Sequence, residues 1–227
     1  MNLPNKLTML RILLTGLTPF VIIAVDNMMI IALNAVLQRY GGPEQGDLLV
    51  AAATVAQSFM LVMTMPLGGI SGGTQAILSY NYGARQFGRV RDAQKKIFRL
   101  CMGFTAVMFV LARAAGPLFV RLFTKDAQVA EISAWAIRVC TLAAIPLGAQ
   151  YEIVDGFTAL GQVRLSFPLS FFRKAVYFAA LFILPACFGA RAAFYAEPVS
   201  DVLGPLASAI AYKLCIGPVL SDGHARV

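Results

Sequence analysis

The chain has 227 residues, of which 59% are hydrophobic and 13% are charged, and its formal net charge is +8. Soluble globular domains are about 45–50% apolar and about 25% charged, so this composition excludes an ordinary soluble domain and indicates a membrane protein. The basic residues stand in short loops between apolar runs. Such a pattern orients membrane helices, and it argues against a nucleic-acid-binding surface.

Six apolar segments are each long enough to cross a bilayer, which takes about 20 residues in a helix. They cover residues 12–37, 48–79, 97–119, 132–154, 167–188 and 192–216. Because lipid offers the backbone no hydrogen-bond partners, each segment is expected to be helical. The predicted fold class is therefore all-α, a polytopic membrane bundle of six transmembrane helices.

The basic residues predict that both ends of the chain lie in the cytoplasm. With the N-terminus inside, thirteen of the nineteen Lys and Arg residues fall on the inner side, as the positive-inside rule requires. This inner set includes Arg164, Arg173 and Lys174, which are counted as cytoplasmic charges. Residues 1–11 and 217–227 are thus predicted to be cytoplasmic and to flank a bundle of residues 12–216. The features suit a bacterial inner (plasma) membrane.

Two places in the apolar segments are expected to bend. Pro66 in the second segment is followed by four glycines before Thr74, among them Gly72 and Gly73. The helix is expected to loosen there, and the glycines suit either close helix packing or a hinge. Pro146 in the fourth segment leaves a backbone carbonyl without its helical partner and is expected to kink the helix.

Charge at membrane depth is costly, so a carboxylate inside a span is a candidate functional group. Asp26, with Asn27 beside it, lies in the middle of the first segment. Asp155 lies at the inner end of the fourth segment, one helical turn after Tyr151 on the same face. A carboxylate with a phenol one turn away can hold a proton or Na⁺. These four residues are the candidate cation- or proton-coupling site.

For Asp26 and Asp155 the alternative role is an ion pair inside the bundle, with Arg138 or Arg173 as the candidate partner of Asp155. Glu197 and Asp201 stand at the start of the sixth segment and are expected to face the outer interface. The four cysteines are isolated in apolar runs, and the one histidine lies in the tail, so the sequence predicts no metal site.

Several motifs resemble the multidrug and toxic compound extrusion (MATE) family. The matching pieces are GLTP at 16–19, GTQA at 73–76, SYNYGARQ at 79–86, ALGQ at 159–162 and PVSD at 198–201. The 79–86 piece is the most specific, and the order and spacing of all the pieces agree over residues 12–215. The pieces resemble the second of the family's two six-helix lobes, so the first lobe is missing from this chain.

The resemblance implies export of organic cations or drugs in exchange for H⁺ or Na⁺, with no other cofactor. Tyr151 and Asp155 resemble that lobe's cation-binding tyrosine and aspartate, and Asp26 or Asn27 falls close to an acidic position of its first helix. Since an alternating-access cavity needs two halves, the chain is expected to act in the bilayer as a homodimer or with a separate N-terminal lobe.

A rival reading comes from residues 1–11, which resemble the start of CDP-alcohol phosphatidyltransferases. Asp155 begins their D-G-x-x-A-R motif, but Leu160 replaces the arginine, and no Asp or Glu occurs from there to Glu197. One aspartate cannot hold two divalent ions, so the sequence predicts a transporter and no enzyme. Residues 1–11 are then foreign to the transporter. An inactive truncated fragment is the third alternative.

Overall fold

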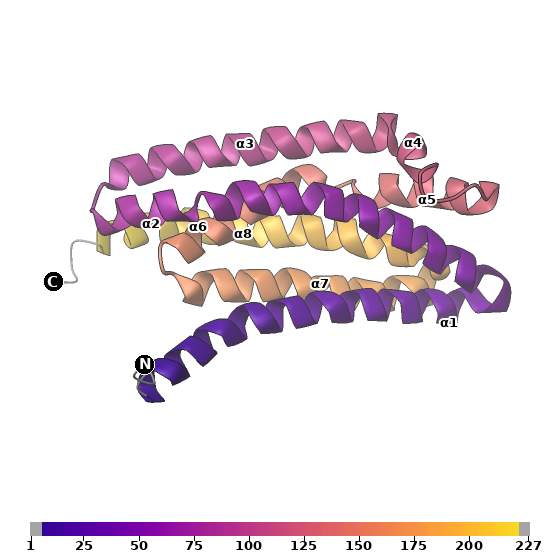
Figure 1. The fold of residues 1–227 in the computed structure, drawn as a ribbon, viewed down its shortest axis with the longest axis horizontal. Coiled ribbons are helices and arrows are strands. Elements are labelled where there is room, and N and C mark those ends of the chain that lie inside the picture. The colour runs from indigo at the N-terminus through magenta and orange to yellow at the C-terminus, as the bar shows by residue number, and fades with distance from the viewer. Residues whose placement is uncertain (1–5, 223–227) are drawn as a thin grey trace, which may run out of the picture.

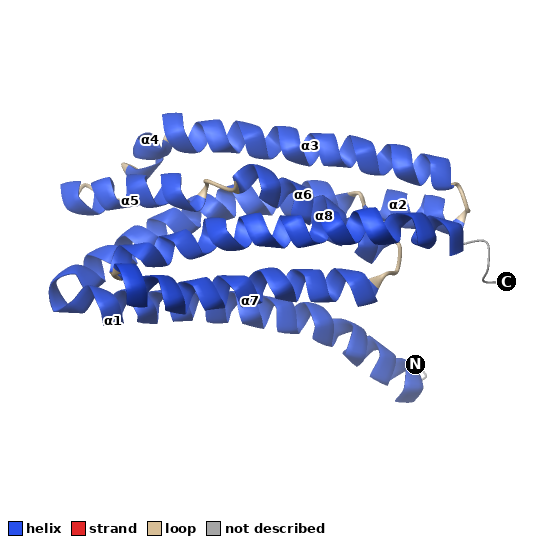
Figure 2. Ribbon diagram, turned by 180° about the vertical axis from the view of Figure 1, so that it is seen from behind, coloured by secondary structure: helices blue, strands red, loops and turns tan. Residues whose placement is uncertain are grey.

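The computed structural model describes the backbone of residues 6–222 and the side chains of residues 24–220. All regular structure in these ranges is helical, which confirms the predicted fold class (Figures 1 and 2). The elements are α1 (Lys6–Gly73), α2 (Gln75–Gly83), α3 (Phe87–Ala114), α4 (Gly116–Val120), α5 (Ala127–Cys140), α6 (Ala144–Ala159), α7 (Val163–Phe188), the 3₁₀ helix η1 (Ala190–Tyr195) and α8 (Ala196–Asp222).

The long element α1 consists of two helices that meet at a sharp reversal. Gly42, at the reversal, has φ 66° and ψ −170°, a backbone conformation that is essentially confined to glycine. The chain turns back at one end of the bundle, as the gap between the first two apolar segments predicts (Figure 1). Of the segment 1–11, residues 6–11 form the start of α1, which continues into the first apolar segment. The rest of that segment, and residues 223–227 of the tail, lie outside the described residues.

The helices can be counted as membrane spans by their length and composition. Four stretches are long and apolar enough to cross a bilayer, and the bent pair formed by α5 and α6 adds a fifth. One of the four is Ala24–Gly83, which Gly42 divides into two. With that division at Gly42, the described residues provide six candidate spans by length and composition. The start of α1 and the end of α8 lie at the same end of the bundle (Figure 1).

The interior of the bundle is formed by lengthwise helix pairs. Helix α7 packs along α8, α3 along α6, and α1 along α5. Large side chains such as Leu37, Met63 and Phe157 are fully buried between the helices. Others, such as Met65 and Phe182, are more than half exposed on the outside. An apolar outer surface suits a bundle that is solvated by lipid.

The stretch after Pro66 differs from the expectation. The helix does not loosen there: α1 continues without a break through Pro66 and Gly72 and ends at Gly73. The interruption is at Thr74, and α2 resumes at Gln75. Neighbouring hydrogen-bonding groups and local adjustments of the turn let membrane helices tolerate proline and glycine, so these residues do not end the helix by themselves.

The fourth span is bent, as Pro146 led us to expect. Helices α5 and α6 meet at an angle of 51° across a short break, residues 141–143. Pro146 lies in the first turn of α6, where its missing N–H would have no helical partner in any case. The break therefore falls just before the proline. Whether this place and the Thr74 break act as hinges stays a prediction.

Candidate functional site

A cavity of about 310 Å³ opens between the two halves of α1 and the helices α6, α7 and α8. Its size is at the lower end of the range of small-molecule pockets, about 300–1,000 Å³. The apolar part of the wall includes Met29, Leu33, Met60, Leu147 and Phe194, and the polar part includes Asp26, Tyr151, Arg173, Tyr177 and Glu197. Two predicted site residues, Asp26 and Tyr151, thus face one cavity although 125 positions separate them in the sequence.

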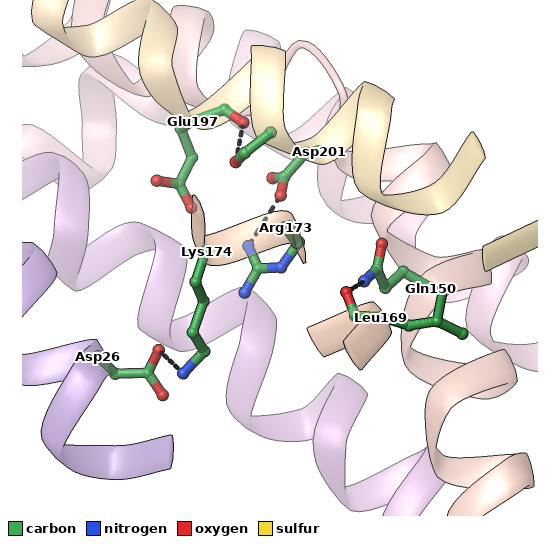
Figure 3. A network of polar contacts seen from close by, with 8 residues as sticks. Asp26, Gln150, Leu169, Arg173, Lys174, Glu197 and Asp201 are labelled. Atoms are coloured by element: carbon green, nitrogen blue, oxygen red, sulfur yellow. Dashed lines mark hydrogen bonds and ion pairs between the residues drawn. The ribbon is translucent and has the colours of Figure 1, made fainter. Parts of the chain in front are cut away.

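Two neighbouring cations of α7 project in different directions beside this cavity. The Lys174 ammonium lies 2.6 Å from a carboxylate oxygen of Asp26 on α1. The Arg173 guanidinium lies 3.0 Å from a carboxylate oxygen of Asp201 on α8. Figure 3 shows the two contacts, which link α7 to both of its neighbours. Asp26 therefore has an ion-pair partner, as one of its two predicted roles required.

The count of Arg173 and Lys174 among the cytoplasmic charges was wrong. Both lie ten or more residues inside α7, and their side chains are only 17% and 5% exposed. Such cations can stay inside a membrane bundle because carboxylates of other helices neutralise them. They consequently do not count toward the orientation, and eleven of the predicted inner charges remain against six outer ones.

Glu197 and Asp201 do not both face the outer interface. Asp201 is fully buried against Arg173, and Glu197 lines the cavity. The two residues are one turn apart in the first turns of α8, so they share the helix face that packs on α7. Sequence reasoning missed them as site residues. Two features of the sequence could have indicated them. Glu197 and Asp201 are four residues apart, and the preceding apolar segment contains the adjacent cations Arg173 and Lys174, which need counter-charges.

Asp155 lies apart from the cavity wall. The Ser71 hydroxyl, in the last turn of α1, donates a hydrogen bond of 2.5 Å to its carboxylate. Gln75, beyond the break at Thr74, also faces this carboxylate. Asp155 thus connects α6 to the place where α1 ends and α2 begins.

The predicted partners of Asp155 are placed elsewhere. Arg173 pairs with Asp201, and the two ion pairs found among residues 24–220 do not include Asp155. Tyr151 lines the cavity, and among these residues no hydrogen bond joins it to Asp155. Asn27 is exposed next to Asp26 and is not part of the cavity wall.

With the geometry established, comparisons with known proteins identify the family. The family model MatE matches residues 20–195, well over half of the chain. The chain belongs to the MatE family. Multidrug export protein MepA of Staphylococcus aureus (strain MSSA476) is 24% identical to this MatE chain over 207 residues, which are 90% of the chain and 44% of MepA. MepA of Staphylococcus haemolyticus (strain JCSC1435) is 24% identical over 214 residues, 93% of the chain and 46% of that protein.

Solved structures agree on the fold. An inward-facing multidrug resistance MATE family transporter superposes with a TM-score of 0.84 at 17% identity, over 96% of this MatE chain and 50% of that transporter. A variant of a Vibrio cholerae MATE transporter gives a TM-score of 0.76 at 16% identity, over 86% of this chain and 44% of that one.

The chain spans about half the length of the curated relatives and structures that it matches. It has the six-helix fold of one half-length lobe of a MATE transporter. The family consists of membrane transporters and not of enzymes, so the phosphatidyltransferase alternative does not hold.

Proposed function

We propose that this MatE chain is one half of a multidrug exporter that moves organic cations out of the cell in exchange for H⁺ or Na⁺. Membership of the family and the similarity to MepA support the export of drugs. We place the transporter in the bacterial inner (plasma) membrane with both ends of the chain in the cytoplasm, on the bias of the basic residues. We propose no cofactor for this transport other than the coupling ion itself.

The observation that carries this proposal is the cavity. Its carboxylates, Asp26 and Glu197, can attract a positive charge. Its apolar wall includes the flexible side chains of Met29 and Met60, which adapt to ligands of different shape. A site with a few charged groups in an apolar wall fits a cation with a hydrophobic body, the substrate class of the proposed exporter.

Lys174 gives the cavity a competing internal cation. Its ammonium already occupies one oxygen of Asp26, so a substrate or coupling cation that binds Asp26 must displace it. Binding then breaks the ion pair between Lys174 and Asp26 and changes the contact between α1 and α7. A ligand shifts a conformational equilibrium only through different affinities for the two states, and this exchange of partners supplies such a difference.

Asp155 couples the ion to the end of α1 in this mechanism. While ionised, it accepts the Ser71 hydroxyl and holds α6 against the last turn of α1. A proton or cation on Asp155 weakens that bond, and the helices can then bend. The bending points are the Thr74 break beside Gly72 and Gly73, and the α5–α6 bend beside Pro146. Pro66 lies within a continuous helix and adds flexibility there.

A complete exporter needs a second half, because alternating access moves one half against the other around a shared site. We propose that a second copy of the chain or a separate N-terminal lobe supplies it. The matched relatives and structures are about twice as long as this chain. That length leaves room for two lobes in one chain, which supports this view.

The test is ethidium efflux from bacteria that lack their major drug pumps. We compare the native chain, Asp155→Asn and the exposed control Asp92→Asn, with expression checked in the membrane fraction and with and without an N-terminal MATE lobe in trans. Efflux by the native chain and by Asp92→Asn, together with its loss in Asp155→Asn, supports the proposal. Native chain that is well expressed but inactive under both conditions, or activity that persists in Asp155→Asn, overturns it.

A further inference from the structure

A second polar cluster, outside the cavity wall, is buried where α6 meets α3 and α8. Glu152 of α6 is 3% exposed and Gln94 of α3 is 2% exposed. Glu152 Oε1 and Gln94 Nε2 are both buried without a hydrogen-bond partner among the described residues. On its other side, Gln94 accepts a hydrogen bond of 3.2 Å from the Tyr212 hydroxyl of α8. Buried polar atoms without partners are rare in proteins, so this pair requires an explanation.

The two unpaired atoms border the same gap. A methyl group built on Gly156 would lie 3.0 Å from Gln94 Nε2 and 3.6 Å from Glu152 Oε1. The missing side chain of Gly156 therefore leaves a small space with an amide on one side and a carboxyl group on the other. The amide of Gln94 can turn over, so that its oxygen faces Glu152 and its nitrogen donates to Tyr212. In that orientation the amide accepts a hydrogen bond from a protonated Glu152.

The charges around Glu152 favour its neutral form. Asp155 follows three residues later on the same face of α6 and is a like charge. Cys101 of α3 and Tyr212 of α8 also lie within electrostatic range, and neither supplies a positive charge. Arg91 of α3 acts on Tyr212, and no ion pair with Glu152 is found among residues 24–220. A buried carboxylate without a cation beside it is unfavourable, whereas the acid form can donate to one partner.

We propose that Glu152 is a second proton-binding residue and that Glu152 and Asp155 together hold one proton. In this conformation the proton is on Glu152, while the Asp155 carboxylate accepts the Ser71 hydroxyl. When the proton passes to Asp155, Glu152 becomes the carboxylate and Asp155 the acid, so the pair keeps one negative charge. The bond to Ser71 is weakened by the same step. The use of this proton to drive export rests on the proposed function, but its place on Glu152 does not.

Infrared spectroscopy of the purified full chain in lipid tests the site without any transport. We expect the carbonyl band of a buried carboxylic acid at neutral pH in the native chain and in the exposed control Glu131→Gln. Glu152→Gln should lose this band, and Asp155→Asn should keep it. Absence of the band from the native chain, or its persistence in Glu152→Gln, overturns the proposal.

A second variant keeps the test decisive if Glu152→Gln does not fold. Gln94→Leu removes the amide that accepts from the acid, so the band should move to the higher frequency of a carbonyl whose acid group has no hydrogen bond. An unchanged frequency contradicts the proposed contact. If the efflux assay fails but the infrared band is lost in Glu152→Gln, the exporter proposal is overturned and the proton site on Glu152 stands. Efflux with no such band overturns the proton site alone.

Discussion

The ion pair between Arg173 and Asp201 provides the sharpest test of how the bundle is held together. It joins α7 to α8 at a distance of 3.0 Å, and the Asp201 side chain is fully buried. Replacement of Asp201 by Asn keeps the size of the side chain and an accepting oxygen but removes the negative charge. The variant therefore leaves the Arg173 guanidinium inside the bundle without its direct counter-ion.

The expected cost follows from the burial of the pair. Removal of one partner of a buried ion pair typically destabilises a protein by about 3–5 kcal/mol, because an uncompensated charge remains. Arg173 keeps some compensation, since Glu197 lies within electrostatic range of it and the new amide oxygen can still accept. We therefore expect the lower end, about 3 kcal/mol, which corresponds to a change of more than about 100-fold in the folding equilibrium.

Equilibrium unfolding of the purified chain in mixed detergent micelles measures this cost. The exposed control Asp92→Asn should change the free energy of unfolding by no more than about 0.5 kcal/mol. The double variant Arg173→Met/Asp201→Leu should recover most of the loss, because an apolar pair of similar volume is often as stable as a buried ion pair. A loss below about 1 kcal/mol in Asp201→Asn, or a double variant as unstable as the single one, would refute the reasoning.

Two glycine substitutions test the packing and the reversal of α1 by the same unfolding measurement. A methyl group on Gly148 would lie 2.7 Å from the Thr105 hydroxyl and 3.1 Å from the Cys101 carbonyl, so Gly148→Ala should cost about 1–3 kcal/mol by forcing α3 and α6 apart. Gly103→Ala is its control in α3, where nothing lies within 4 Å of the added methyl, and it should be neutral or slightly stabilising. Gly42→Ala meets no atom within 4 Å either, but φ of 66° should make it cost about 1–3 kcal/mol through backbone strain alone. A neutral Gly148→Ala would contradict the close approach of α3 and α6, and a neutral Gly42→Ala would contradict the strained reversal.

The sequence by itself determined the fold class and the apolar helices that make up the bundle. Each span is encoded locally, because a long apolar run can satisfy its backbone in lipid only as a helix. The turn at Gly42 and the bend before Pro146 were also predictable, since glycine and proline act on the backbone within a few residues. The intramembrane carboxylates Asp26 and Asp155 stood out for the same local reason, as charges inside apolar runs.

Only the tertiary structure decided which charged groups meet. Lys174 pairs with Asp26 across 148 positions, and Ser71 bonds Asp155 across 84. By composition alone, Arg173 and Lys174 were indistinguishable from cations of a cytoplasmic loop. A charge can stay at membrane depth when another helix brings a counter-charge to it, and that depends on which helix faces pack together. Local sequence fixes the faces of each helix, but the choice of neighbour belongs to the packed bundle as a whole.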